Sequence, residues 1–318
     1  MGDILVTIDG SAFSEYALPV ALDIARRSRA RVHVVQVHEA AMAVVQGGDV
    51  PVFDQTLDQM LRRQEEKYLL TLANRCEQRG VRPRTELLDG PVSAAISRYA
   101  AEVGIDMIVM TTHGRGGISR AWVGSVADAL VRRGPVPVLL VRPKQDQANW
   151  DRELQTRHIL VPLDGSPLSE SVLSHAVALG SLNRARYTLL RIVLPLPFLA
   201  MPGAPPVFNE EGARQSVADA DVYLERVAGR LRAEGVRVDV KAVMHSVPAQ
   251  GILDYAACNA VDAIVMATHG RGGWSRVALG SVADKVMRGT MMPVMLYRPT
   301  LAERDEHADT TEEVETHA

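Results

Sequence analysis

The chain has 318 residues, of which 47% are hydrophobic and 4% aromatic, and its formal net charge is −3. The length favours two domains, and the hydrophobic content is sufficient for two buried cores. The scarcity of aromatic residues argues against a base-stacking platform for single-stranded nucleic acid. The small net charge argues against a surface that binds nucleic acid or an anionic membrane.

Features that bear on location favour the cytoplasm. The N-terminus enters an apolar strand pattern at once, without the layout of a signal peptide. The most apolar region, Tyr187–Pro206, is interrupted by Arg191 and several prolines, so we do not expect it to cross a membrane. Cys76 and Cys258 lie in helix-like segments without a CxxC motif, which is typical of reduced cysteines in the cytosol. We therefore expect a soluble cytoplasmic protein.

The first half of the chain alternates strand-like and helix-like segments. Apolar runs predict buried strands, at Ile4–Ile8, Val32–Val37, Thr85–Leu88, Met107–Met110 and Val136–Val141. Helical spacing predicts the segments between them, at Ala17–Arg26, Thr56–Arg79, Pro91–Val103 and Val126–Arg132. A long connection, Glu39–Gln55, precedes the second helix. Because each strand is followed by a helix, we expect parallel strands joined by right-handed crossovers.

The second half repeats this order. Asp106–Pro143 and Asp262–Pro299 share 23 identical pairs in 38 at a constant offset of 156, which indicates an internal duplication. The repeated strands are predicted at His158–Leu163, Tyr187–Leu194, Val238–Val243, Ala263–Met266 and Pro293–Tyr297. The repeated helices are predicted at Gly212–Glu234, Pro248–Asn259 and Val282–Arg288.

The duplication sets the domain boundaries and the fold class. We expect two tandem, doubly wound, Rossmann-like α/β domains, each with a five-stranded parallel sheet of strand order 3-2-1-4-5. They span residues 1–144 and 157–300, and a polar linker at 145–156 joins them. Residues 301–318 are rich in acidic side chains and poor in apolar ones, which predicts a disordered tail.

Each repeat carries a glycine-rich turn between a buried strand and a helix, with Gly-Arg-Gly-Gly followed after nine residues by Gly-Ser. Glycines let backbone N–H groups approach an anion, and a helix N-terminus favours negative charge, so a phosphate site is predicted. Its residues are Gly114, Arg115, Gly116, Gly117, Gly124, Ser125 and Val126 in the first repeat and Gly270, Arg271, Gly272, Gly273, Gly280, Ser281 and Val282 in the second.

Structural alternatives exist for the same residues. The glycines could simply shape a tight connection between strand and helix. Ser125 and Ser281 also fit as N-caps, with Asp128 and Asp284 completing a Ser-x-x-Asp capping box. The arginines that follow the first glycine either clamp phosphate or lie in solvent.

Asp9 and Asp164 end the first strand of their repeats. In the order 3-2-1-4-5, strands 1 and 4 are neighbours whose connections leave in opposite directions, so each aspartate converges with its glycine motif on one crevice. The carboxylates could hold a ribose hydroxyl, an adenine edge or a hydrated metal ion, or could only form a turn with their own backbone. His113 and His269 have no neighbouring nucleophile and are interpreted as packing or loop residues.

Several familiar site motifs are absent from the sequence. No HExxH or HxH spacing indicates a zinc site. The glycine motif lacks the third glycine of GxGxxG, and GxxxxGK[ST] does not occur. A classical dehydrogenase and a P-loop ATPase are therefore disfavoured.

These motifs resemble those of the universal stress protein family in its tandem two-domain form. Its nucleotide-binding members carry G-x-x-G, nine residues, then G-S/T; here the last three fixed positions occur twice, and Thr111 and Ala267 replace the first glycine. The resemblance implies that Asp9 and Asp164 contact adenosine and that the backbone at Val37 and Ile192 meets adenine. It further implies an ATP-binding module in each repeat, an intramolecular pseudo-dimer paired through the fifth strands, and the option of a homodimer.

By this resemblance we expect a cytoplasmic ATP-binding stress protein that senses or regulates. No evident base activates water, so any hydrolysis should be slow. We expect ATP to need Mg²⁺ or Mn²⁺ as a bridge between carboxylate and phosphates. The alternative is a family member without nucleotide that serves as a protein-interaction scaffold, which Thr111 and Ala267 keep open. A third option is an enzyme of the wider adenosine-binding group. Such an enzyme would need a substrate domain, and the two repeats, the linker and the tail already account for the chain.

Overall fold

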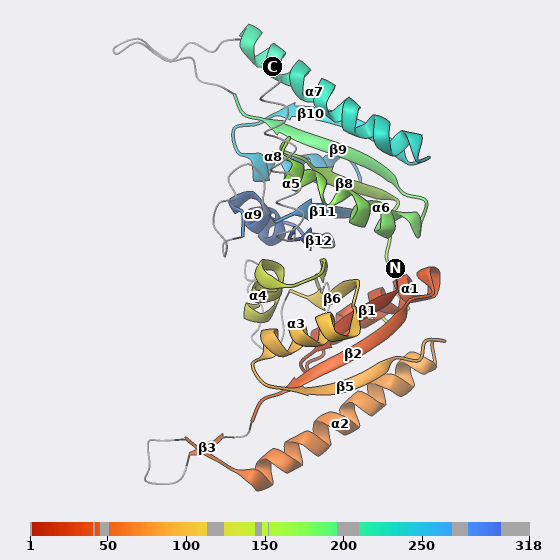
Figure 1. Cartoon of the computed structure of the whole chain (residues 1–318), viewed down its shortest axis with the longest axis vertical. Coiled ribbons are helices and arrows are strands. Elements are labelled where there is room, and N and C mark those ends of the chain that lie inside the picture. Colours follow the sequence, from red (N-terminus) through yellow and green to blue (C-terminus); the bar gives the residue numbers. More distant parts are fainter. Residues whose placement is uncertain are drawn as a thin grey trace. The chain divides into compact units, whose positions relative to one another are not determined.

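The computed structural model describes residues 2–40, 42–44, 51–112, 124–143, 148–151, 153–195, 210–268 and 279–299. The chain divides into two compact units, Met1–Leu154 and Gln155–Ala318 (Figure 1). Each unit contains an open parallel sheet with helices packed on it. None of the described helices is long and apolar enough to span a membrane.

The sheet of the first unit has the predicted strand order. Its strands run β5-β2-β1-β6-β7, and each neighbouring pair is parallel. Their bounds are β1 (Asp3–Ile8), β2 (Arg31–His38), β5 (Arg84–Asp89), β6 (Met107–Thr111) and β7 (Val138–Val141). Every residue of β1, β6 and β7 is buried, as expected for parallel strands covered on both faces.

The helices of the first unit follow the strands as predicted. They are the short 3-10 helix η1 (Ser14–Tyr16), α1 (Ala17–Ser28), α2 (Gln55–Glu77), α3 (Val92–Val103) and α4 (Ser125–Arg133). Asp54 caps α2, because its side chain accepts hydrogen bonds from the backbone of Thr56 and Leu57. Long α2 packs on β2 and β5 (Figure 1).

The connection between β2 and α2 contains a feature that was not predicted. β3 (Met42–Val44) and β4 (Pro51–Phe53) pair as an antiparallel hairpin. Runs of three residues are too short to show a strand period in the sequence. The hairpin therefore becomes visible only in three dimensions.

The second unit repeats the topology in the order β10-β9-β8-β11-β12. Its strands are parallel and comprise β8 (His158–Pro162), β9 (Arg186–Val193), β10 (Arg237–Met244), β11 (Ala263–Ala267) and β12 (Val294–Tyr297). Its helices are α5 (Pro167–Glu170), α6 (Leu173–Ser181), α7 (Glu210–Ala233), α8 (Pro248–Cys258) and α9 (Ser281–Gly289). The predicted doubly wound α/β fold is confirmed in both repeats.

The described part of the predicted linker up to Leu154 packs on the first unit. Trp150 and Leu154 are buried. The guanidinium of Arg75 lies 4.0 Å from the centre of the Trp150 ring, and the Leu154 N–H donates to Asp23 Oδ2 at 3.0 Å. The contact between the Trp150 ring and the Arg75 guanidinium thus stabilises the position of this otherwise polar segment. The predicted acidic tail, 301–318, lies outside the described residues.

The two cysteines differ in their surroundings. Cys76 is buried and Cys258 is exposed. Burial raises the pKa of Cys76 to about 11, so its thiol stays protonated and unreactive at neutral pH.

Candidate functional site

Asp9 forms a tight turn at the carboxyl end of β1. Its Oδ1 accepts hydrogen bonds from the Ser11 N–H at 2.9 Å and from the Ser11 hydroxyl at 2.6 Å. The Asp9 N–H is satisfied by Ser14 Oγ at 3.2 Å. Gly10 adopts φ 81°, a value that glycine reaches without a steric penalty. The turn-forming alternative for Asp9 is therefore observed, and the turn also fixes the direction of its carboxylate.

The second repeat builds the same turn from the corresponding residues. Asp164 Oδ1 accepts from the Ser166 N–H at 2.9 Å and from the Ser166 hydroxyl at 2.6 Å. Ser169 Oγ lies 3.3 Å from the Asp164 N–H, and Gly165 has φ 87°. Both aspartates are half-buried. The duplication therefore extends to individual hydrogen bonds.

Strand register places Val37 and Ile192 beside these turns. Ile8 pairs with Gln36, so the next residues along the two strands, Asp9 and Val37, lie at the same level. Pro162 pairs with Leu190, which puts Asp164 level with Ile192 in the same way. Each aspartate therefore lies next to the β2 or β9 position that the resemblance assigned to adenine.

The other side of each site is a helix N-terminus. The N–H of Gly124 donates to the carbonyl of Thr112, just past β6, at 2.7 Å, and Gly280 donates to Thr268 at 2.9 Å. The pairing of Val6 with Val109 brings Thr112 level with Asp9. The start of α4 is thus tied to the strand end that neighbours the Asp9 turn, and the topological switch point is present.

The first turn of α4 and of α9 presents backbone amides that can bind an anion. The first hydrogen bond within α4 runs from the Asp128 N–H to the Gly124 carbonyl, and the first within α9 runs from the Asp284 N–H to the Gly280 carbonyl. The three amides before each aspartate therefore have no partner inside the helix. Ser125 and Ser281 are exposed, and the valines after them are half-buried. Backbone N–H groups and a helix dipole at a reachable position can hold a phosphate.

The predicted capping box is wrong. The N-caps are Gly124 and Gly280, and neither helix has a side-chain capping bond. Asp128 and Asp284 instead pair with arginines one turn later, at 2.7 Å to Arg132 and 2.9 Å to Arg288. The serines sit one residue inside the helix, where a hydroxyl cannot reach the amides that an N-cap satisfies.

Part of the predicted site lies outside the described residues. These residues are Gly114, Arg115, Gly116, Gly117, Gly270, Arg271, Gly272 and Gly273, together with His113 and His269. The residues that replace the first motif glycine are described: Thr111 is 6% and Ala267 is 7% exposed. Both side chains are therefore packed into the strand end.

Behind each aspartate turn lies a polar cluster that was not predicted. The Tyr68 hydroxyl donates to Glu15 Oε1 at 3.0 Å, and Arg75 pairs with the same carboxylate at 3.4 Å. In the second repeat, Tyr223 donates to Glu170 at 2.9 Å and Arg230 pairs with Glu170. The three positions recur at an offset of 155. This recurrence was the available signal, but it is spread over 60 residues of each repeat.

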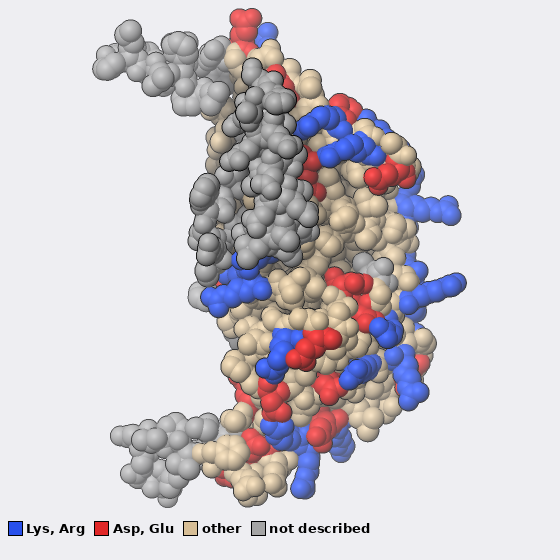
Figure 2. All heavy atoms as spheres, viewed as in Figure 1, with Lys and Arg blue, Asp and Glu red and all other residues tan. Residues whose placement is uncertain are grey.

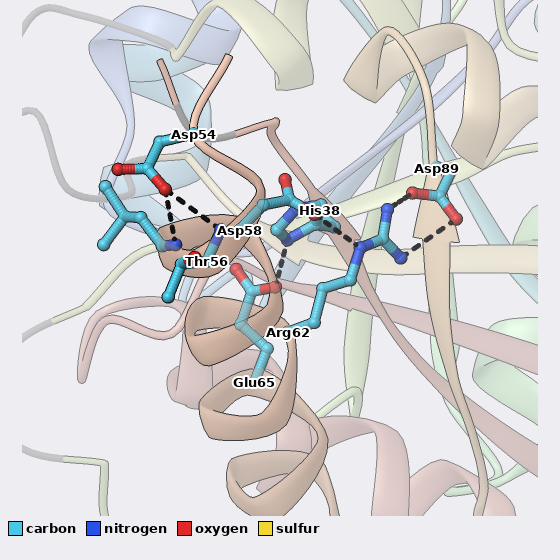
Figure 3. A network of polar contacts seen from close by, with 8 residues as sticks. His38, Asp54, Thr56, Asp58, Arg62, Glu65 and Asp89 are labelled. Atoms are coloured by element: carbon cyan, nitrogen blue, oxygen red, sulfur yellow. Dashed lines mark hydrogen bonds and ion pairs between the residues drawn. The ribbon is translucent and has the colours of Figure 1, made fainter. Parts of the chain in front are cut away.

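A second unpredicted network occurs in the first repeat. His38, at the end of β2, contacts Asp58 and Glu65 of α2, and Arg62 joins Asp58 to Asp89 at the end of β5 (Figure 3). Nothing in a motif scan marks this network, because its members are single charged residues on three separate elements.

Charge on the visible surface is mixed. Figure 2 shows Lys and Arg side chains interspersed with Asp and Glu side chains over the described part of the face in view. Among the described residues, no group of three or more His, Cys, Asp or Glu is arranged to hold a metal ion. A cation at either site would therefore need ligand oxygens from another source, such as phosphates.

The family model for the universal stress protein family matches residues 1–142 and 155–298. The chain belongs to the universal stress protein family. The match covers both repeats and omits the linker and the acidic tail. The resemblance drawn from the motifs is therefore confirmed.

Individual universal stress proteins are similar over long stretches. A universal stress protein of Mycolicibacterium smegmatis is 30% identical over 224 residues, which cover 70% of this chain and 71% of the relative. One of Mycobacterium tuberculosis is 32% identical over 196 residues, or 61% of this chain and 62% of that protein's length. The crystal structure of a universal stress protein from Archaeoglobus fulgidus superposes with a TM-score of 0.65 at 20% identity, covering 94% of this chain and 97% of the other. That structural likeness concerns the fold.

Proposed function

We propose that each repeat binds an adenine nucleotide at the carboxyl end of its sheet. The observation that carries this proposal is the duplicated convergence of the aspartate turn, the neighbouring second-strand position and the helix N-terminus. Asp9, Val37 and Gly124 meet at one switch point, and Asp164, Ile192 and Gly280 meet at the other. Because the same arrangement occurs in both repeats, it is better explained by the same kind of ligand at each site than by chance.

The three parts suit different portions of the ligand. The carboxylates of Asp9 and Asp164 are held by serine bonds at 2.6 Å and 2.9 Å, and would accept bonds from ribose hydroxyls or from water on a cation. The backbone at Val37 and Ile192 would face the adenine. The open amides at the start of α4 and α9 would hold phosphates. A Mg²⁺ or Mn²⁺ ion would neutralise charge between the aspartate and the phosphates.

The same geometry supports a regulator. No described side chain at either switch point has the arrangement of a general base beside a nucleophile, and hydrolysis should be slow for that reason. A slowly hydrolysed ligand can report nucleotide level through occupancy alone. We infer a cytoplasmic role in the stress response in which ATP occupancy alters what the protein contacts.

Calorimetry tests the proposal directly. ATP titrated into the full chain, with and without Mg²⁺ or Mn²⁺, should give saturable heat that is larger with the metal. Mass spectrometry of nucleotide released by heating the purified protein should detect an adenine nucleotide. No heat at millimolar ATP under either condition would remove the nucleotide proposal.

A specific observation keeps a scaffold role as the second candidate. The side chains of Thr111 and Ala267 occupy the position of the first motif glycine and are buried at the strand end. Replacing both with glycine in one variant should raise ATP affinity if they hinder binding. A chain that binds no ATP before or after this change would act through protein contacts.

A further inference from the structure

The His38 cluster, defined here as His38, Asp58, Arg62, Glu65 and Asp89, is buried at its centre. The His38 side chain is 1% exposed, and those of Asp58 and Glu65 are 10% and 19% exposed. His38 Nε2 lies 2.9 Å from Asp58 Oδ1, and Nδ1 lies 2.6 Å from Glu65 Oε2. Each ring nitrogen therefore has its own carboxylate partner (Figure 3).

This geometry requires an additional proton. An ionised carboxylate can only accept, so both ring nitrogens must donate, and a neutral imidazole has one N–H. The imidazole is therefore protonated on both ring nitrogens, which is one proton more than neutral histidine carries. Without that proton, a nitrogen lone pair would face a carboxylate oxygen inside the protein, which is strongly unfavourable.

Charged groups on two packed elements surround the imidazole: the carboxylates of Asp58 and Glu65 favour its protonated state, and the positive charge of Arg62 opposes it. From α2, Asp58 and Glu65 face the imidazole, and Arg62 pairs with Asp58 at 3.2 Å. From β5, Asp89 lies level with His38 and bonds Arg62, which holds the pKa of Asp89 below its ordinary value. On the other side of β2, the strand β1 ends in Thr7 and Ile8, which do not titrate, and the carboxylate of Asp9 follows them, level with Val37.

The second repeat has apolar residues at all five positions. At an offset of 155, Val193 stands for His38, Ala213 for Asp58, Val217 for Arg62, Ala220 for Glu65 and Met244 for Asp89. The contact between these elements needs no charge to form, since β9, α7 and β10 pack there without one. The cluster is therefore a property that one repeat has and the other lacks.

We propose that the His38 cluster is a proton-dependent latch that holds the carboxyl end of β2 against α2 and β5, so that the site in the first repeat responds to pH and the site in the second does not. His38 directly follows Val37, and the latch therefore acts on the edge of the first site. The proton-binding part stands without any nucleotide, and the effect on ATP rests on the proposed function.

The sign of the pH dependence follows from the hydrogen bonds. Burial disfavours the charge on His38, but the bonds to Asp58 and Glu65 outweigh it, so the pKa of His38 lies above its ordinary value. A group with a raised folded pKa contributes its stability in full below the unfolded pKa, about 6.5, and loses it as pH rises through the folded value. The latch is closed in mild acid and opens toward alkaline pH.

Side-chain nitrogen NMR of the 318-residue chain tests the proton directly. Both His38 nitrogens should carry protons at pH 6.5, and its titration midpoint should lie above that pH; the His38→Val variant assigns the signals. A midpoint at or below 6.5 would overturn the proposal. Because the titration uses the unaltered protein, its result does not depend on any variant folding.

Hydrogen exchange then tests the latch. Corrected for intrinsic rates, protection of the amides at Val37 and His38 should fall by up to about tenfold for each pH unit between the unfolded and folded pKa values. Protection at Ile192 and Val193 should stay constant. Equal behaviour of the two strands would contradict the proposal.

A variant that copies the second repeat removes the latch. His38→Val, Asp58→Ala and Glu65→Ala together should abolish the pH dependence of β2, whereas His245→Gln, at a histidine 3.7 Å from Asp254, should leave it unchanged. ATP affinity of the first site, isolated by Gly280→Glu, should weaken as pH rises. Absence of ATP binding at every pH would overturn the proposed function, and the titration and exchange would still decide the latch.

Discussion

The two repeats share the backbone of the site and differ in the chemistry beneath it. The aspartate turns match bond for bond, and both glycine N-caps bond the carbonyl of a threonine at the preceding strand end. Beneath β2 the first repeat buries a histidine between two carboxylates, while the second has valine and alanine there. The two repeats therefore share the backbone geometry of the candidate site, while the side chains packed around it differ.

The largest expected effect is the loss of ATP binding at one site while the other site keeps its affinity. Gly124→Glu and Gly280→Glu should each lower ATP affinity at their own site at least 100-fold, about 3 kcal/mol, because a carboxylate would occupy the phosphate position. The fold should survive, since Gly124 has φ −58° and a Cβ there would lie 3.4 Å from the nearest atom, Thr112 O. Calorimetry on the full chain measures the change.

Gly124→Ala is the matched control for the first site. It adds only a methyl group at an unstrained position, so affinity should stay near wild type. If both glutamate variants keep wild-type affinity, the phosphate does not sit at these helix ends.

The next effect concerns the His38 cluster, which only the first repeat has. His38→Val should destabilise the first unit by about 2 kcal/mol at pH 6, because Asp58 and Glu65 lose their buried partner. Removing those carboxylates as well should recover most of the loss. Denaturant unfolding measures both, followed by Trp150 fluorescence in a background where Trp122 and Trp274 are replaced by phenylalanine, so that the signal reports on the first unit. An equal loss in the single and triple variants would count against the explanation.

A smaller effect should be equal in the two repeats. Tyr68→Phe and Tyr223→Phe each remove one hydroxyl that donates to a glutamate, at 3.0 Å and 2.9 Å. Each should cost about 1 kcal/mol. Exchange protection of the adjacent strands in each unit measures the losses, and a loss confined to one repeat would show that the clusters are not equivalent.

The smallest expected effect ranks the two sites. The connection at 195–208 holds five prolines, whereas 39–55 holds one, and proline lowers the entropy lost when a segment orders over a ligand. We expect the second site to bind ATP about threefold more tightly, roughly 0.6 kcal/mol. Comparing Gly124→Glu, which leaves site two, with Gly280→Glu, which leaves site one, measures the ratio. Tighter binding by site one would reverse the ranking.

The sequence by itself determined the fold and the duplication, and it predicted the centre of each candidate site. Strands such as Ile4–Ile8 are continuous apolar runs, and burial on both faces leaves that pattern wherever a parallel sheet forms. The aspartates and Gly-Ser pairs were found because they follow strands directly or open helices, and sequence position alone fixes that relation. The family followed from the same residues.

Tertiary structure alone decided the parts built from distant residues. The sequence offered Ser125 as an alternative N-cap of α4, but Gly124 is the N-cap, because the bond from its N–H to Thr112 fixes where the helix begins. Trp150 lies in the predicted polar linker, and only the folded chain places it against Arg75. His38, Asp58 and Asp89 come from two strands and a helix, and their charges carry no sequence period. Hydrogen bonds between such residues depend on register and packing, which only the folded chain defines.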